Sequence, residues 1–351
     1  MTKSIQDNGL VGMRVLATLG IAFFHFELSY PFIEGIQVFS TAYLLVEFFF
    51  MLSGFLFAKG VLDGKYRNKS LILIIKDRIM RLWPTYIVGL IFLPIVYSLA
   101  WYEGNYFKWL LEGSHLKSYL AEIFMLQSIG VSRFEYINGP AWYVSALLFA
   151  TIVAWFAIKK IGKGNFIFLI SICLYIFIGI FESPSMSTQK FILKYIPVPL
   201  LRGIAGILLG VSLYYCYTKI GDKIFNLSRQ MISVIEIVAF LLGLRLLLYR
   251  NSNWLNFGVL IPFSILIIVM YSDNKGILSK ILSNKKWSYL SNISFAFYIM
   301  QSFCSNILTC MCPNVKQPWA FIWYMFFNCT CAIIVYELIE KSGKKLLEYF
   351  K

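Results

Sequence analysis

Long apolar stretches recur from one end of this chain to the other, separated by short polar connections. Ten of them are near the roughly 20 residues that a helix needs to cross the hydrocarbon core of a bilayer. They cover residues 11–29, 39–58, 82–101, 141–158, 165–181, 199–217, 230–249, 254–271, 289–310 and 318–339. The pattern predicts an all-α bundle of about ten transmembrane helices. We expect residues 1–351 to form a single integral-membrane domain with no appended soluble domain.

Positive charge alternates between the connections. Of the 32 Lys and Arg residues, 22 lie in one alternate set of connections and termini, 7 lie in the other set, and three lie inside spans. Because cytoplasmic connections collect Lys and Arg, this asymmetry predicts that both termini are cytoplasmic. It also accounts for most of the net charge of +15 without a nucleic-acid partner.

Composition agrees with a membrane protein. Hydrophobic residues make up 59% of the chain and charged residues 14%, against about 25% charged residues in soluble domains. The first apolar stretch lacks a small-residue cleavage site, so we expect a span there rather than a signal peptide. The seven cysteines lie mostly in apolar runs, where they pack as small apolar side chains, and no metal site is predicted.

Two connections stand out by length and charge. The predicted inside connection from Lys59 to Arg81 is dense in positive charge. The predicted outside connection, residues 102–140, is the longest and contains the segment SYLAEIFMLQSIG, residues 118–130. We interpret this segment as an amphipathic or re-entrant piece.

The first span carries two polar side chains that lipid would not tolerate. In GMRVLATLGIAFFHFE, residues 12–27, Arg14 precedes His25 by eleven residues. At about 100° and 1.5 Å per residue, both lie on one helix face about 16 Å apart. Such a face looks into protein or a wet cavity, although Arg14 alone could also snorkel to the headgroups. Since histidine exchanges protons near neutral pH, we expect an anion site on the cytoplasmic side and a proton acceptor farther out.

Arg78 and Arg81 lie one helical turn apart, next to the basic connection. The positive-inside pattern alone explains such a pair. The functional alternative is a dock for phosphate groups, whose oxygens the guanidinium fork matches. Pro84 is well placed to begin the third span.

Four further polar or aromatic residues fall within spans or at their ends. Glu47 could form a buried ion pair with an arginine or orient His25. Ser53, beside a glycine, most simply reflects close helix packing. Trp142 fits either an interfacial belt or the wall of an acceptor site, and Arg202 either snorkels or lines a pocket. Of the other candidates, we expect His115 to be solvated and Arg245 to snorkel.

Together these residues resemble the membrane acyltransferase-3 family. An Arg, ten intervening residues and a His on the first span match its signature. VEFFFMLSGFLF (residues 46–57) resembles its second-span motif, and RIMRLWP (78–84) its Arg-rich entry to the third span. PAWYVSALLF (140–149) and RGIAGILLG (202–210) match weaker patterns. SFAFYIMQ (294–301) resembles a late-span motif that often ends in His, where this chain has Gln301.

The resemblance covers nearly the whole chain and implies an enzyme, an O-acyltransferase. Members move an acetyl group from cytoplasmic acetyl-CoA to a hydroxyl of an extracytoplasmic glycan such as O-antigen (lipopolysaccharide), capsule or exopolysaccharide. It implies a multi-pass protein of the bacterial plasma (inner) membrane. Its partners would be acetyl-CoA as co-substrate, an envelope glycan or lipid-linked saccharide, and membrane lipid, with no bound cofactor.

Under this resemblance the candidate residues take roles. His25 and Arg14 are the expected catalytic residues, and Arg78 and Arg81 the expected donor-binding residues. The cavity or acceptor side is expected at Glu47, Ser53, Trp142 and Arg202.

Two other functions fit a polytopic chain of this size. A lipid-linked glycan flippase would favour internal repeats and broken helices, which this sequence does not display. A glycan polymerase would carry several arginines in its large outside connection, whereas Arg133 is the one arginine of residues 102–140. Transfer of labelled acetyl from acetyl-CoA to a glycan separates the acyltransferase from both.

Overall fold

The computed structural model describes residues 9–34, 36–131, 136–182, 191–248 and 254–342. Arg133 lies outside the described residues. Within them, ten helical segments are long and apolar enough to cross a membrane, which confirms the predicted all-α polytopic bundle. The segments with their short helical extensions are Leu10–Glu27, Ala42–Leu62, Leu71–Trp101, Gly139–Ile161, Gly164–Phe181, Val198–Phe225, Arg229–Leu247, Trp254–Tyr271, Lys285–Met311 and Trp319–Glu340.

The individual elements follow in chain order. They are α1 (Leu10–Glu27), η2 (Ala42–Leu44), α2 (Leu45–Leu62), α3 (Leu71–Trp101), α4 (Tyr106–Leu111), α5 (His115–Ile123), η3 (Gln127–Ile129), η4 (Gly139–Ala141), α6 (Trp142–Phe156), η5 (Ala157–Ile161), α7 (Gly164–Phe181), α8 (Val198–Phe225), α9 (Arg229–Leu247), η6 (Trp254–Val259), α10 (Leu260–Tyr271), α11 (Ile277–Leu282), α12 (Lys285–Met311), α13 (Trp319–Val335) and η7 (Tyr336–Glu340). Two-residue strands β1 (Phe191–Ile192) and β2 (Ile196–Pro197) pair antiparallel ahead of α8.

The third span begins earlier than the hydropathy predicts. Residues 71–81 belong to α3, and the Ser70 side chain caps it by accepting a hydrogen bond from the Leu73 backbone N–H at 3.4 Å. Pro84 therefore lies inside the helix, and the prediction that it starts the span is wrong. Arg78 and Arg81 likewise sit on α3 rather than in a connection, because a cap and not the edge of the apolar run sets the helix start.

Helices α2 and α8 form the centre of the bundle. In the most apolar window of each, 78% of the residues are buried, against 28% for α7, α9 and the α13 segment at the periphery. Small residues allow the close approach of α2 and α8. A Cβ on Gly54 would collide with the backbone of Ile207, and one on Gly210 with the backbone of Met51.

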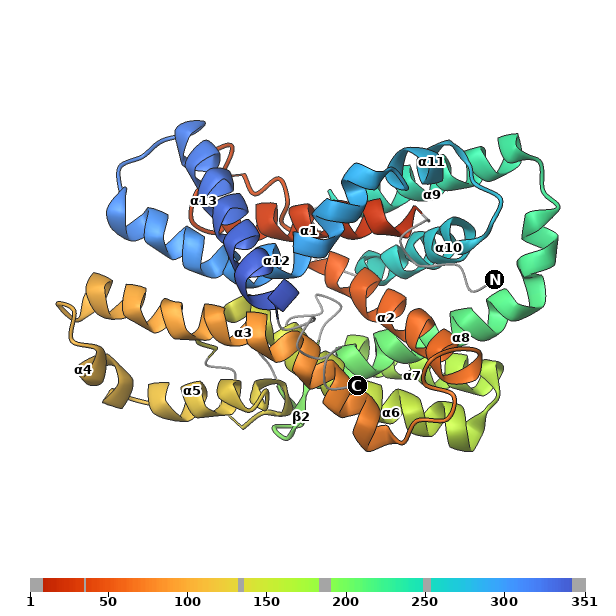
Figure 1. Ribbon diagram of the computed structural model, residues 1–351, viewed down its shortest axis with the longest axis horizontal. Helices are drawn as coiled ribbons and strands as arrows, with labels where there is room; N and C mark the ends of the chain where they lie inside the picture. The colour runs from red at the N-terminus through yellow and green to blue at the C-terminus, as the bar shows by residue number, and fades with distance from the viewer. Residues whose placement is uncertain (1–8, 35, 132–135, 183–190, 249–253, 343–351) are drawn as a thin grey trace.

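Helix α1 is enclosed by other elements. It lies across the middle of the molecule beside α12 in Figure 1, and it also contacts α2, α10 and α11. Gly20 and Phe24 face α2 and η2, through the side chains of Leu45 and Tyr43. Ala22 and Phe26 face α12 and α13. No residue of α1 is exposed, so the helix presents no broad face to lipid.

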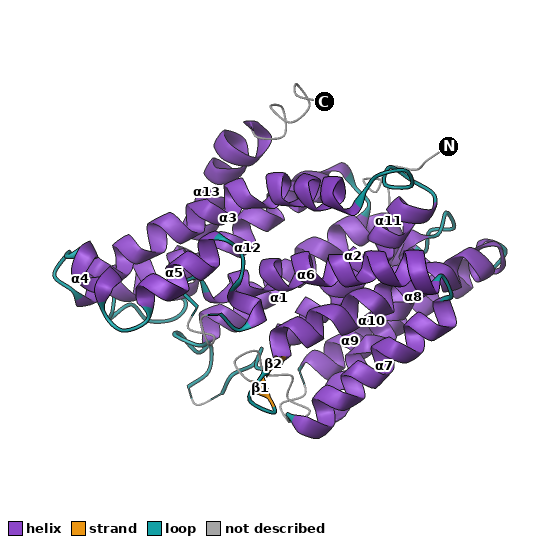
Figure 2. Ribbon diagram, turned by 90° about the horizontal axis from the view of Figure 1, so that it is seen from below, coloured by secondary structure: helices purple, strands orange, loops and turns teal. Residues whose placement is uncertain are grey.

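The long outside connection folds back along α3. Figures 1 and 2 show α4 at one end of α3 and α5 alongside it. At the far end of α5, the Tyr86 hydroxyl donates to the Glu122 carbonyl at 2.8 Å, and the Trp83 indole donates to the Ile123 carbonyl at 3.2 Å. Because Trp83 lies 18 residues before the outer end of α3, the chain returns about 27 Å toward the other side. Residues 118–130 therefore run back along α3, as expected of a re-entrant piece, and we call them the re-entrant segment.

Candidate active site

The polar face of α1 points into the bundle. At about 100° per residue, Arg14, Thr18 and His25 lie between the row that contacts α2 and the row that contacts α12 and α13. Thr18 is buried, whereas Arg14 and His25 are half-buried. Both functional candidates therefore face protein rather than hydrocarbon, on a single uninterrupted helix, with His25 in its last turn.

Arg14 meets three elements that come together near the start of α1. It interacts electrostatically with Arg81 of α3, Tyr143 of α6 and Glu340 of η7. The beginning of α1 and the end of the last span thus lie on one side of the bundle, as an even number of crossings requires. The charge asymmetry predicts that this is the cytoplasmic side.

Arg14, Arg78 and Arg81 form what we call the arginine cluster. Arg78 and Arg14 each interact electrostatically with Arg81, and both interact with Tyr143. Arg78 also stacks its guanidinium over the Phe57 ring at 5.1 Å. Among the described residues, no carboxylate lies within 4.0 Å of these three guanidinium groups. Like charges held together in this way favour binding of an anion.

Arg202 has the opposite environment. It is fully buried, and its Nη2 and Nε atoms lie 2.7 and 2.8 Å from Glu47 Oε1. The other carboxylate oxygen of Glu47 accepts a hydrogen bond of 2.6 Å from the Tyr175 hydroxyl. Arg202 therefore does not snorkel. Glu47 pairs with it and does not contact His25 among the described residues.

Aromatic side chains complete the surroundings of this ion pair. The Arg202 guanidinium lies 5.2 Å from the ring of Trp142 and 6.0 Å from that of Tyr43. Trp142 is buried, which excludes the interfacial-belt interpretation and leaves the interior one. The re-entrant segment covers this residue, because Ser128 donates a hydrogen bond to the Trp142 carbonyl at 2.6 Å.

Tyr143 connects the two arginine environments. Its hydroxyl lies 3.3 Å from the Ser53 hydroxyl. It interacts electrostatically with Arg14, Arg78 and Glu47, and its ring lies 4.7 Å from that of Phe50. Tyr143 was not among the site candidates predicted from the sequence. Its one distinguishing signal is that it follows Trp142 in the PAWYVSALLF stretch.

A row of polar residues on α12 faces the same interior. Its members recur every three or four residues and are all buried: Ser291, Ser294, Tyr298, Gln301 and Ser305. Tyr298 donates to the Pro140 carbonyl, and its ring lies 6.0 Å from that of Tyr143. Both side-chain amide atoms of Gln301 lack a hydrogen-bond partner among the described residues. A fully buried amide without partners is rare and points to a ligand or water.

The comparison with family models decides the family. The acyltransferase-3 model, described as an acyltransferase domain, matches residues 7–337. The chain belongs to the acyltransferase-3 family. No curated protein and no solved structure matches it. The match spans all ten helices and identifies the chain as a multi-pass membrane acyltransferase.

Within this acyltransferase, the structure brings most candidate residues into one connected region. Tyr143 links Arg14 and Arg78 to Ser53 and Glu47 through the interactions described above. Arg202 and Trp142 adjoin that region, while His25 lies farther along α1 on the same face. His115 and Arg245 lie outside this region. His115 is not simply solvated, since it stacks on Trp109, whereas Arg245 is exposed.

Proposed function

We propose that this acyltransferase moves an acetyl group from cytoplasmic acetyl-CoA to a hydroxyl of an extracytoplasmic envelope glycan in the bacterial plasma membrane. One observation carries the proposal. Arg14 of the arginine cluster and His25 lie on a single face of α1. The charge asymmetry predicts that the Arg14 end of this face is cytoplasmic. The charged donor would bind at the Arg14 end of this face, and the external alcohol would react at the His25 end.

The arginine cluster suits the phosphate groups of coenzyme A. Arg14, Arg78 and Arg81 come from two helices, and among the described residues none has a carboxylate within 4.0 Å. Guanidinium groups bind phosphate oxygens through paired charge-assisted hydrogen bonds. Since free adenosine phosphates are cytosolic, the location matches the donor. The slender pantetheine arm would extend from here toward His25.

His25 suits the transfer step. As a general base, its imidazole takes the proton of the acceptor hydroxyl while the oxygen attacks the thioester carbonyl. The new C–O bond forms, the C–S bond breaks, and the proton passes to the departing sulfur to give the free thiol of coenzyme A. The residue types also permit a second order of events, in which His25 first carries the acetyl group.

Isotope transfer tests the proposal. Membranes containing the protein, supplied with acetyl-labelled acetyl-CoA, should label their envelope glycan, and His25→Ala should abolish the label with unchanged protein content. Arg245→Ala is the matched control, since it removes an exposed arginine of α9 outside the site. Labelling that survives in His25→Ala would refute the role of His25. Labelling from other acyl-CoA donors but not from acetyl-CoA would refute the acetyl assignment.

A further inference from the structure

A pocket lined by aromatic and polar side chains lies at the outer end of α3, α4 and α12. It encloses about 590 Å³, within the range of about 300–1,000 Å³ typical of small-molecule sites. Its main lining residues are Tyr97, Trp101, Trp109, Glu112, His115 and Asn306. None of them belongs to the arginine cluster or to the α1 face, so this pocket is separate from the site described above.

The rings of this pocket converge on one another. Tyr97 stacks on Trp101 with centroids 5.1 Å apart, and Trp109 stacks on His115 at 4.8 Å with an interplanar angle of 17°. Tyr97 and Trp109 are 6.1 Å apart and connect the two stacks. Trp109 is buried, whereas Trp101 is 62% exposed. An interfacial belt would instead carry such rings separately along the lipid boundary.

Polar groups surround these rings. His115 Nδ1 lies 2.8 Å from the Trp109 carbonyl, which can only accept, so Nδ1 carries the proton. The Nε2 atom of the neutral ring is then an acceptor. Glu112 is exposed and supplies carboxylate oxygens. The side-chain nitrogen of Asn306 donates to the Ser302 carbonyl at 2.8 Å, which leaves its oxygen as an acceptor.

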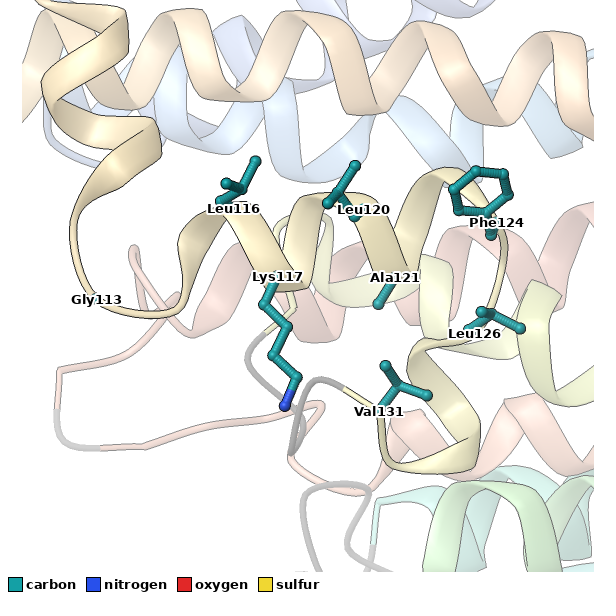
Figure 3. Close-up of a pocket in the computed structure, with 8 residues that line it drawn as sticks. All are labelled: Gly113, Leu116, Lys117, Leu120, Ala121, Phe124, Leu126 and Val131. Carbon is teal, nitrogen blue, oxygen red and sulfur yellow. The ribbon is translucent and has the colours of Figure 1, made fainter.

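The neighbouring groove makes a useful contrast. Figure 3 shows it along α5, lined by Leu116, Leu120, Phe124, Leu126 and Val131, with Lys117 as the charged member. It offers almost no hydrogen-bonding groups. The two pockets share Gly113, so an apolar groove adjoins an aromatic, polar pocket.

We propose that the aromatic pocket binds a pyranose unit of the acceptor glycan; this rests on the proposed function. A pyranose has apolar C–H faces and an equatorial rim of hydroxyl donors. The exposed Trp101 ring provides a flat platform for such a face. Glu112, His115 and Asn306 provide acceptors for the hydroxyl rim. The pocket binds the sugar, and acyl transfer takes place at the α1 face.

Binding measured without the acetyl donor tests the pocket independently of transfer. The probe is the oligosaccharide fraction released by mild acid from the envelope of the native host, titrated into the purified protein in nanodiscs. We expect saturable binding that Trp101→Ala weakens at least tenfold and that Trp101→Phe largely retains. Leu120→Ala, in the apolar groove, should bind normally, and all variants should bind coenzyme A normally.

Each outcome distinguishes the two proposals. No binding by the wild type, or equal binding by wild type and Trp101→Ala, overturns the pocket even when acetyl transfer persists. Binding that depends on Trp101, together with absent acetyl transfer, supports the pocket and overturns the proposed function. Asn306→Ala gives a second readout. It should raise the KM for the acceptor several-fold and leave the KM for acetyl-CoA unchanged.

Discussion

Two groups of arginines lie within this bundle, and they are treated in opposite ways. Arg202 is fully buried against Glu47, between the rings of Trp142 and Tyr43. The arginine cluster has no carboxylate within 4.0 Å among the described residues and is half-buried or exposed. A neutralised arginine fixes helices relative to one another, whereas an arginine without such a partner keeps its donors for a ligand. We therefore interpret Arg202 as a structural charge and propose that the arginine cluster is a binding charge.

Removing one partner of the buried pair should have the largest effect. Glu47→Ala leaves the Arg202 charge without its carboxylate, and breaking a buried pair costs about 3–5 kcal/mol. We expect the variant to lose most of its folded protein, measured by size-exclusion chromatography in detergent. The double variant Glu47→Leu with Arg202→Met should restore much of the yield, because it removes both charges. Normal yield of Glu47→Ala alone would contradict a structural pair.

The arginine cluster should respond differently. Arg14→Ala removes charge-assisted hydrogen bonds to the donor, worth about 1.5–3 kcal/mol, which corresponds to roughly 10- to 100-fold in the KM for acetyl-CoA. Folded yield should stay near that of wild type, since Arg14 has no carboxylate within 4.0 Å among the described residues. Arg78→Ala should behave in the same way, while Arg245→Ala should not. An unchanged donor KM in both cluster variants would show that the cluster does not bind phosphate.

Hydropathy predicted the ten spans because lipid imposes that pattern on each segment separately. The start of α3 was missed because Lys76, Asp77, Arg78 and Arg81 lower the hydropathy of a helix that Ser70 caps. The shared face of Arg14 and His25 was predictable because both lie on one helix. The partners of Glu47 were not predictable, since Arg202 lies 155 residues away along the chain and Tyr175 lies 128 residues away.

Gln301 tests whether the interior contains further binding groups. A buried amide without partners costs about 1–3 kcal/mol of stability. Gln301→Leu should therefore raise the melting temperature of the protein measured without ligand. Because Gln301 shares its helix row with Tyr298, we expect the same variant to lower the transfer rate about tenfold. A lower melting temperature would show that the amide already has a partner in the free protein. An unchanged rate would remove it from the site.

The smallest effect concerns Glu122, whose carboxylate accepts from the backbone N–H groups of Ile137 and Asn138 and so holds the return of the re-entrant segment. Burial raises the pKa of Glu122 to about 8, outweighing these two hydrogen bonds. A carboxyl whose pKa is raised on folding stabilises most below its unfolded value, and that contribution is lost as pH rises through the folded value. The melting temperature should therefore fall by a few degrees between pH 7 and 9. Glu122→Gln should flatten this slope, and an equally steep slope in that variant would assign the titration to another group.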